Sequence, residues 1–154
     1  MAKNPPETIR SAWPLFVTTH AAVVARIEAA LAGAGLPELA WYDVLWAIER
    51  SPEQKLRLHE LARELVFSRS NLTRLVDRIE EARLVKRERA EDDRRGYYAV
   101  ITAAGVGLRK KMWPVYSKAI EAYFDRHLTQ AENTTVRGVL RRVLDAAREP
   151  WRET

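Results

Sequence analysis

Arginine, asparagine and hydroxyl side chains recur at helical spacing between residues 68 and 78 of this 154-residue chain. Four aliphatic residues at three- and four-residue steps predict the inner side of the helix: Leu72, Leu75, Val76 and Ile79. Arg and Asn suit bidentate bonds to guanine and adenine edges, while Ser and Thr suit phosphate oxygens. The candidate contacts to double-stranded DNA on this helix are Ser68, Arg69, Ser70, Asn71, Thr73, Arg74 and Arg78.

A second basic group, Arg94 and Arg95, lies beside Gly96 in a turn-rich segment between two short strand-like runs. Arginine at the tip of such a hairpin suits a narrow minor groove, whose negative potential attracts it. Asp93 is placed to pair with Arg95 and to stabilise the tip. The alternative is an ordinary charged turn in contact with solvent.

Acidic residues lie among these arginines and leave another interpretation open. Asp77, Glu80 and Glu81 fall at positions where they can pair with the helix arginines through i, i+3 or i+4 contacts. A solvated helix with internal ion pairs would then need no DNA. The recurrence of arginine on both the helix and the hairpin favours DNA contact.

Composition narrows the classes of function. The chain has 26 Lys and Arg against 21 Asp and Glu, a net charge of +5 and a pI near 9.7, which modestly favours an anionic partner. It has no cysteine, and His20, His59 and His127 lie on separate predicted segments, so we expect no metal site. No phosphate-binding loop, dinucleotide fingerprint or nucleophile motif occurs. We therefore expect neither an enzyme nor a cofactor.

The elements that position the basic groups are mostly helices. A helix-turn-helix comes before the predicted hairpin of residues 84–89 and 97–101, so we predict a mainly α (α+β) fold with a winged helix-turn-helix lobe at about 38–102. Pro114 should kink the fifth helix, and Thr129 with Glu132 forms a capping box for the last. The predicted helices cover about 7–31, 39–51, 58–67, 69–83, 103–127 and 130–149.

The terminal helices, at about 7–34 and 103–149, carry apolar stripes that the small winged lobe cannot cover. Association of two chains would bury the stripes, so we expect a symmetric homodimer formed by these helices within one single-domain chain. The predicted interface residues are Val136, Leu140, Val143 and Leu144.

The sequence resembles the MarR-type winged-helix transcriptional regulators. YDVLWAIERSP resembles their second helix, LHELARELVFSRSNLTRLVDRIEEARLV their helix-turn-helix, and DRRGYYAVIT their wing motif, with Asp93 and Arg95 as its polar residues. The resemblance implies a DNA-binding repressor. Val66 and Arg83 replace glycines that many members have, which puts the backbone geometry at these two positions in question.

Aromatic residues on the first, second and fifth helices form a further group. Members of the family commonly bind small aromatic or phenolic anions, and we expect an aromatic carboxylate or phenol in a cleft lined by Trp13, His20, Trp46 and Tyr116. Packing in the core is the alternative for aromatics at helical spacing.

The function we predict is a homodimeric, sequence-specific transcriptional regulator of pseudo-palindromic operators. A winged-helix module that binds only protein is the alternative, although such a surface should carry more exposed apolar anchors. No apolar run is expected to reach the length of a membrane span, and MAKNPPETIRSAW lacks the order of a signal peptide. We therefore expect no membrane association and a cytoplasmic location.

Overall fold

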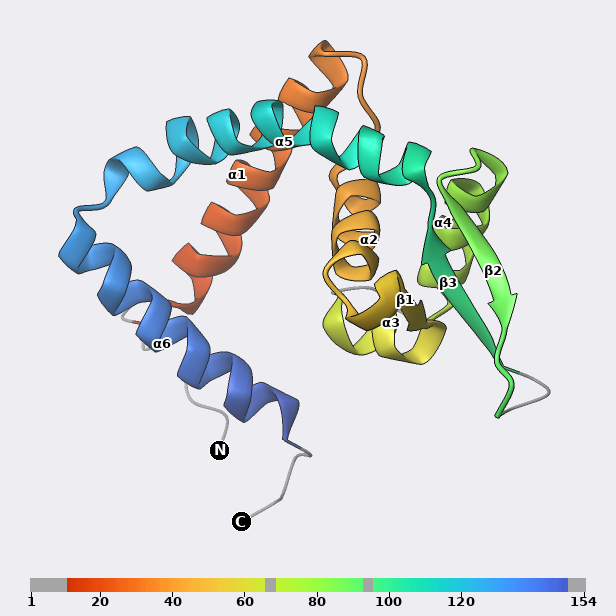
Figure 1. Cartoon of the computed structure of the whole chain (residues 1–154). Coiled ribbons are helices and arrows are strands. Elements are labelled where there is room, and N and C mark those ends of the chain that lie inside the picture. The colour runs from red at the N-terminus through yellow and green to blue at the C-terminus, as the bar shows by residue number, and fades with distance from the viewer. Residues whose placement is uncertain (1–10, 66–68, 93–95, 150–154) are drawn as a thin grey trace.

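The computed structural model describes residues 11–65, 69–92 and 96–149. Helices dominate, and a small antiparallel sheet lies at one end of the molecule (Figure 1). The prediction of a mainly α fold with a winged helix-turn-helix is therefore confirmed. In chain order the elements are α1 (Trp13–Gly33), α2 (Leu39–Glu49), η2 (Pro52–Gln54), β1 (Lys55–Arg57), α3 (Leu58–Glu64), α4 (Arg69–Glu81), β2 (Val85–Arg89), β3 (Tyr97–Ile101), α5 (Ala103–Tyr123), η3 (Asp125–His127) and α6 (Gln130–Arg148).

The sheet has the strand order β1-β3-β2, with both neighbouring pairs antiparallel. Ala99 in the central strand lies between Leu56 of β1 and Arg87 of β2. The β2–β3 hairpin is the predicted wing. Sequence analysis missed β1, because three residues next to a helix are too short to show an alternating pattern.

Two clusters of buried residues meet at α2. One cluster fills the winged lobe, where Val44, Leu45 and Ile48 of α2 pack with α3, α4 and the sheet. The other lies between α1, α2 and α5, and includes Tyr42 of α2 and Met112 of α5. Because α2 belongs to both clusters, it connects the winged lobe mechanically to the long helices.

The turn after α4 requires the backbone geometry that glycine would have provided. Arg83 adopts φ 62°, and the amides of Arg83 and Leu84 donate to the carbonyls of Glu80 and Ile79. This is the Schellman pattern that ends many helices, usually with glycine at the left-handed position. Val66 lies outside the described residues.

The start of α5 packs very closely against this turn. Thr102 accepts a hydrogen bond from the Gly105 amide at 3.1 Å and donates one to the Arg83 carbonyl at 2.8 Å. A Cβ atom at Gly105 would lie 2.2 Å from the Leu84 carbonyl oxygen. Only glycine therefore allows α5 to begin so close to the turn that follows α4. Farther along, α5 continues through Pro114, where we expected a kink.

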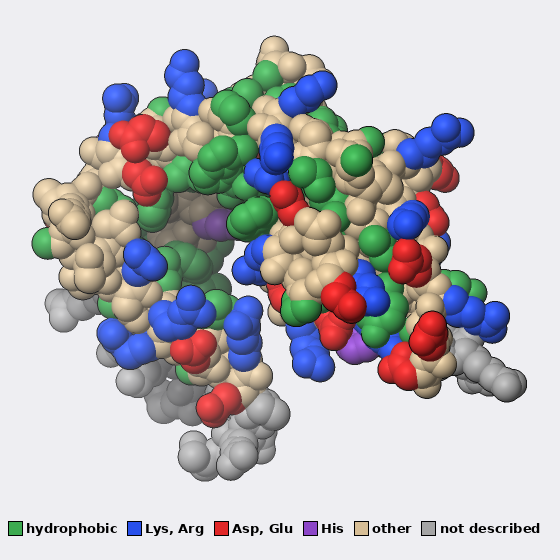
Figure 2. All heavy atoms as spheres, viewed as in Figure 1, with side chains coloured by type: hydrophobic (Ala, Val, Ile, Leu, Met, Phe, Trp, Pro, Cys, Tyr) green, Lys and Arg blue, Asp and Glu red, His purple; other side chains and the backbone are tan. Residues whose placement is uncertain are grey.

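The terminal helices leave apolar side chains uncovered. α6 has no buried residue, and its Val143 is 58% exposed. On α1, Leu15 is 71% exposed and Trp13 63%. Figure 2 shows hydrophobic side chains gathered along the hollow that α1, α5 and α6 surround. The predicted capping box of α6 is present, with the Thr129 amide donating to Glu132 at 2.8 Å.

The sequence-based expectation about membrane-length segments needs a correction. α1 is long and apolar enough, by length and composition, to cross a membrane. One such helix is weak support for a span, since helices at packed interfaces satisfy the same criterion. Only Ile27 and Leu31 of α1 are buried, in a cluster shared with α5, and residues 13–22 of the helix are exposed.

Candidate nucleic-acid interface

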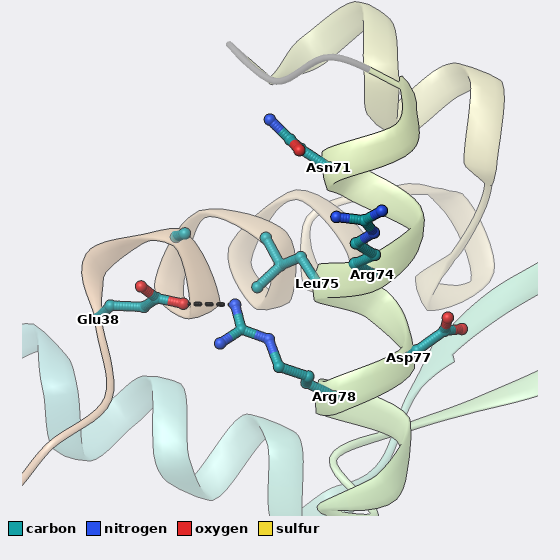
Figure 3. Close-up of a pocket in the computed structure, with 7 residues that line it drawn as sticks. Glu38, Asn71, Arg74, Leu75, Asp77 and Arg78 are labelled. Carbon is teal, nitrogen blue, oxygen red and sulfur yellow. Dashed lines mark hydrogen bonds and ion pairs between the residues drawn. The ribbon is translucent and has the colours of Figure 1, made fainter.

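α4 has one buried side and one polar side, as its sequence predicts. Leu72, Leu75, Val76 and Ile79 are all buried in the winged lobe. Asn71, Leu75 and Arg78 extend to the side of α4 that faces α2, while Asp77 points to the other side, toward the strands (Figure 3). Ser70, Asn71, Arg74 and Arg78 are exposed and Thr73 is half-buried.

The acidic residues of α4 pair chiefly with the wing. Arg87 of β2 contacts Asp77 and lies 3.0 Å from Glu80, Nη1 to Oε2. Arg87 of the strand therefore pairs with two of the three acids that were expected to compete for the helix arginines. These two acids are therefore not available to neutralise Arg74.

The two described arginines on the outer face differ in their partners. Arg78 donates to Glu38, at the start of α2, with an Nη2–Oε1 distance of 2.6 Å (Figure 3). Arg74 forms no hydrogen bond or ion pair with another described residue. Both line an open depression of about 590 Å³ between α2 and α4, together with Glu38, Ala40, Asn71, Leu75 and Asp77. Arg74 is therefore the better placed of the two to donate to a ligand.

A third basic group lies on the sheet and was not found from the sequence. Lys55 and Arg57 of β1 place their charged groups 5.0 and 4.9 Å from the centre of the Tyr98 ring in β3. Arg57 also pairs with Asp92, at the end of the wing nearest its tip. Because β1 was not predicted, nothing in the sequence placed these cations beside the wing.

Part of the predicted DNA surface falls outside the described residues, namely Ser68, Asp93, Arg94 and Arg95. Arg69 begins α4. The wing strands β2 and β3 on either side of residues 93–95 are described and pair in antiparallel register.

A second cavity, of about 390 Å³, lies between α2 and α5. Trp46 and Tyr116, two of the four predicted effector contacts, line it. Trp13 and His20 do not; both are exposed on α1. The complete lining is Tyr42, Asp43, Trp46, Arg109, Trp113, Tyr116 and Ile120.

The ionisable groups of this cavity have perturbed pKa values. Burial, with a smaller effect from the Glu28 carboxylate, raises the pKa of Asp43 to about 6. Burial also raises the pKa of Tyr116 to about 12, to which Asp43 and Tyr42 contribute. The Glu49 carboxylate holds the pKa of the Arg109 guanidinium above its usual value. No cluster of acidic, histidine or cysteine ligands suited to a metal ion occurs among the residues that the structure describes.

With this geometry in place, comparisons with known proteins identify the class. Residues 34–96, which contain α2, the helix-turn-helix and the first wing strand, β2, match the model of the MarR family. The winged-helix segment of the chain is therefore similar to that of the MarR family of transcriptional regulators. A search of curated proteins finds no match.

Solved structures share the fold over nearly the whole chain. AbsC, a MarR family transcriptional regulator from Streptomyces coelicolor, is 26% identical with a TM-score of 0.83 over 96% of this chain and 98% of its own. Sco3205 from the same organism, solved in complex with DNA, is 22% identical with a TM-score of 0.85 over 96% and 94%. BpsR of Bordetella bronchiseptica, whose DNA binding 6-hydroxynicotinic acid regulates, is 19% identical with a TM-score of 0.78 over 88% and 94%.

Proposed function

We propose that this regulator binds a pseudo-palindromic operator as a homodimer and represses transcription. In this proposal each α4 enters a major groove, and each wing reaches the flanking minor groove through Arg94 and Arg95, with Asp93 supporting the wing tip. Two copies of α4 related by a two-fold axis would read half-sites about one helical turn apart. The terminal helices form the dimer, and the protein acts in the cytoplasm.

The observation that carries the DNA-binding proposal is the separation of charge around α4. Arg87 of β2 takes up Asp77 and Glu80, so these two acids do not occupy Arg74 on the outer face. A module that binds only protein would need exposed apolar anchors on this lobe. Among the described residues of the lobe, the large exposed apolar side chains are Trp46 and Tyr97, which lie on different elements.

The dimer proposal depends on the apolar side chains of α1 and α6. Val139, Leu140, Val143 and Leu144 are all exposed on α6, and Val136 is half-buried. A stripe of this kind is unfavourable in water unless another apolar surface covers it. A second copy of the same stripe is self-complementary and gives a closed assembly.

We also propose that a small aromatic molecule releases the regulator from DNA. The cavity between α2 and α5 offers rings for stacking, and BpsR responds to an aromatic acid. A ligand that binds more tightly to an arrangement of α2 and α5 that cannot bind DNA shifts the protein toward that arrangement. The loss of DNA affinity is set by the difference between the ligand's affinities for the two arrangements.

The experiment that tests DNA binding is selection of duplexes from a random pool, followed by anisotropy titration across salt concentrations. We expect selected sites with two-fold symmetry and an affinity well above that for scrambled duplex. The logarithm of affinity should fall linearly with the logarithm of salt concentration, because phosphate contacts release counterions. Equal affinity for selected and scrambled duplexes would exclude sequence-specific regulation.

A further inference from the structure

The cavity between α2 and α5 is lined by aromatic rings that remain accessible. Tyr42 stacks on Trp113 at a centroid distance of 6.0 Å, and Tyr116 meets both rings edge-on, at 5.0 and 5.9 Å. Trp46 and Trp113 are 41% and 45% exposed. With a volume of about 390 Å³, the cavity suits a small ring system. The faces of such rings attract cations as well as other rings.

Arg109, which could be expected to bind an anion here, is already fully engaged. Its Nε and Nη2 atoms donate to the two carboxylate oxygens of Glu49 at 2.6 and 2.8 Å. The side chains of this pair are only 13% and 14% exposed. Arg109 also bonds with the Tyr42 hydroxyl and lies over the Trp46 ring at 5.1 Å. An anionic ligand would have to break a mostly buried bidentate pair, which is costly.

Asp43 is in the opposite situation. It lines the cavity half-buried, and no hydrogen bond or ion pair joins its carboxylate to another described residue. The Glu28 carboxylate from α1 helps to raise the pKa of Asp43, and Asp43 in turn raises the pKa values of the phenols Tyr42 and Tyr116. At pH 7.5 the carboxylate is ionised despite its raised pKa. Asp43 is therefore a carboxylate in the cavity with no cationic partner among the described residues, because Arg109, the cation of the lining, is bound to Glu49.

We propose that this cavity binds a small aromatic cation, such as an aromatic amine or an aromatic quaternary ammonium compound. Asp43 provides the counter-charge, and the faces of Trp46, Trp113 and Tyr116 provide the stacking surface. This assignment replaces the aromatic carboxylate or phenol expected from the sequence, because the cation that such a ligand needs is already bound to Glu49.

The position of the site gives the ligand a route to the DNA-binding helix. Asp43 and Trp46 face the cavity, while Val44 and Leu45 on the same helix pack against the core that α4 completes. A ligand that shifts α2 relative to α5 therefore displaces the support of α4. This regulatory consequence depends on the proposed function, whereas binding of the cation does not.

Binding can be tested on the full chain without DNA. Phenyltrimethylammonium, its neutral isostere tert-butylbenzene and the anion benzoate are compared by ligand-detected NMR, with tryptophan fluorescence as a second readout. We expect phenyltrimethylammonium to bind at least tenfold more tightly than either of the other two. Asp43→Asn should lose that preference, whereas Glu121→Gln, which removes an exposed acid elsewhere on α5, should keep it.

The wild-type chain provides an independent readout in case Asp43→Asn does not fold. Affinity for the cation should fall about tenfold between pH 7.5 and pH 5, since protonation removes the charge of Asp43. Tighter binding of benzoate than of the cation, unchanged affinity in Asp43→Asn, affinity independent of pH, or no binding of the cation would each overturn the assignment. Operator binding is measured separately, without ligand. Loss of operator binding would count against the proposed function, whereas the outcomes above count only against the cation site.

Discussion

The winged lobe and the terminal helices differ in how much of their apolar surface is buried within one chain. In the winged lobe, short elements from residues 39–101 enclose one apolar cluster, and their outer surfaces are charged. In the terminal helices, α6 buries nothing and α1 buries only Ile27 and Leu31, so most of their apolar residues are exposed. The first region is complete within one chain, while the second is the kind of surface that a partner covers.

The two regions also use charge differently. In the winged lobe, ion pairs join separate elements, as Arg87 does with Asp77 and Arg78 with Glu38, and they leave Arg74 without an ionic partner among described residues. In the long helices, the Arg109–Glu49 pair lies mostly buried and joins α5 to α2. In the winged lobe, ion pairs therefore position the side chains around α4. In the long helices, an ion pair joins α5 to α2, where the two regions meet.

The largest effect is expected from breaking the proposed assembly. Leu140→Asp places a charge in the exposed apolar stripe of α6, where burial in a dimer would be strongly unfavourable. We expect a monomer at micromolar concentration in sedimentation and at least a hundredfold loss of operator affinity. Arg141→Asp, on the same helix outside the predicted interface, is the control and should remain dimeric. A Leu140→Asp protein that stays dimeric would contradict the assignment of this face.

Arg74→Ala should act on DNA recognition alone. Loss of a contact to a base edge should weaken specific binding by about 1 to 3 kcal/mol and relax selectivity at one base position. Anisotropy titrations of the selected operator and of single-base variants measure both quantities. Arg137→Ala, an exposed arginine on α6, is the matched control. Equal loss of specific and nonspecific affinity would reduce Arg74 to a phosphate contact.

Asp43→Asn tests the junction between the two regions through the stability of the unliganded protein. The raised pKa of Asp43 means that the folded state holds its proton more tightly than the unfolded state does. This contribution to stability is complete below about pH 4 and is lost as the pH rises through about 6. The variant should be more stable than wild type by about 1 kcal/mol at pH 7.5, a value reduced for partial solvent access, and nearly equal at pH 4. Denaturant titrations at the two pH values measure the free energy of unfolding of both proteins. A difference between variant and wild type that does not change with pH would contradict the prediction.

The smallest predicted effect is local to the winged lobe. Arg83 has a left-handed backbone, which is unfavourable for any residue with a Cβ atom and which glycine adopts freely. We therefore expect Arg83→Gly to raise the free energy of unfolding by about 0.5 to 1 kcal/mol. Dimer mass should not change. A loss of stability would mean that the Arg83 side chain contributes more than its backbone costs.

The sequence predicted those features that depend on neighbours along the chain. The buried side of α4, the wing hairpin and the cap of α6 by Thr129 all follow from local spacing and were found in the structure. The pairing of Asp77 with Arg87 and of Arg109 with Glu49 was not predicted, because both pairs join separate elements. The anion expected in the cavity came from the family resemblance and from a lining that included His20, whereas the structure lines the cavity with Asp43 and with an Arg109 already paired to Glu49.

The most direct test of the central claim, that two chains present two copies of α4 to one operator, is the mass of the protein–DNA complex. Sedimentation equilibrium on the selected duplex should give two chains per duplex, with half-sites about ten base pairs apart from centre to centre. A duplex with one half-site scrambled should bind much more weakly. One chain bound tightly to the intact operator, with no dependence on the second half-site, would contradict the account.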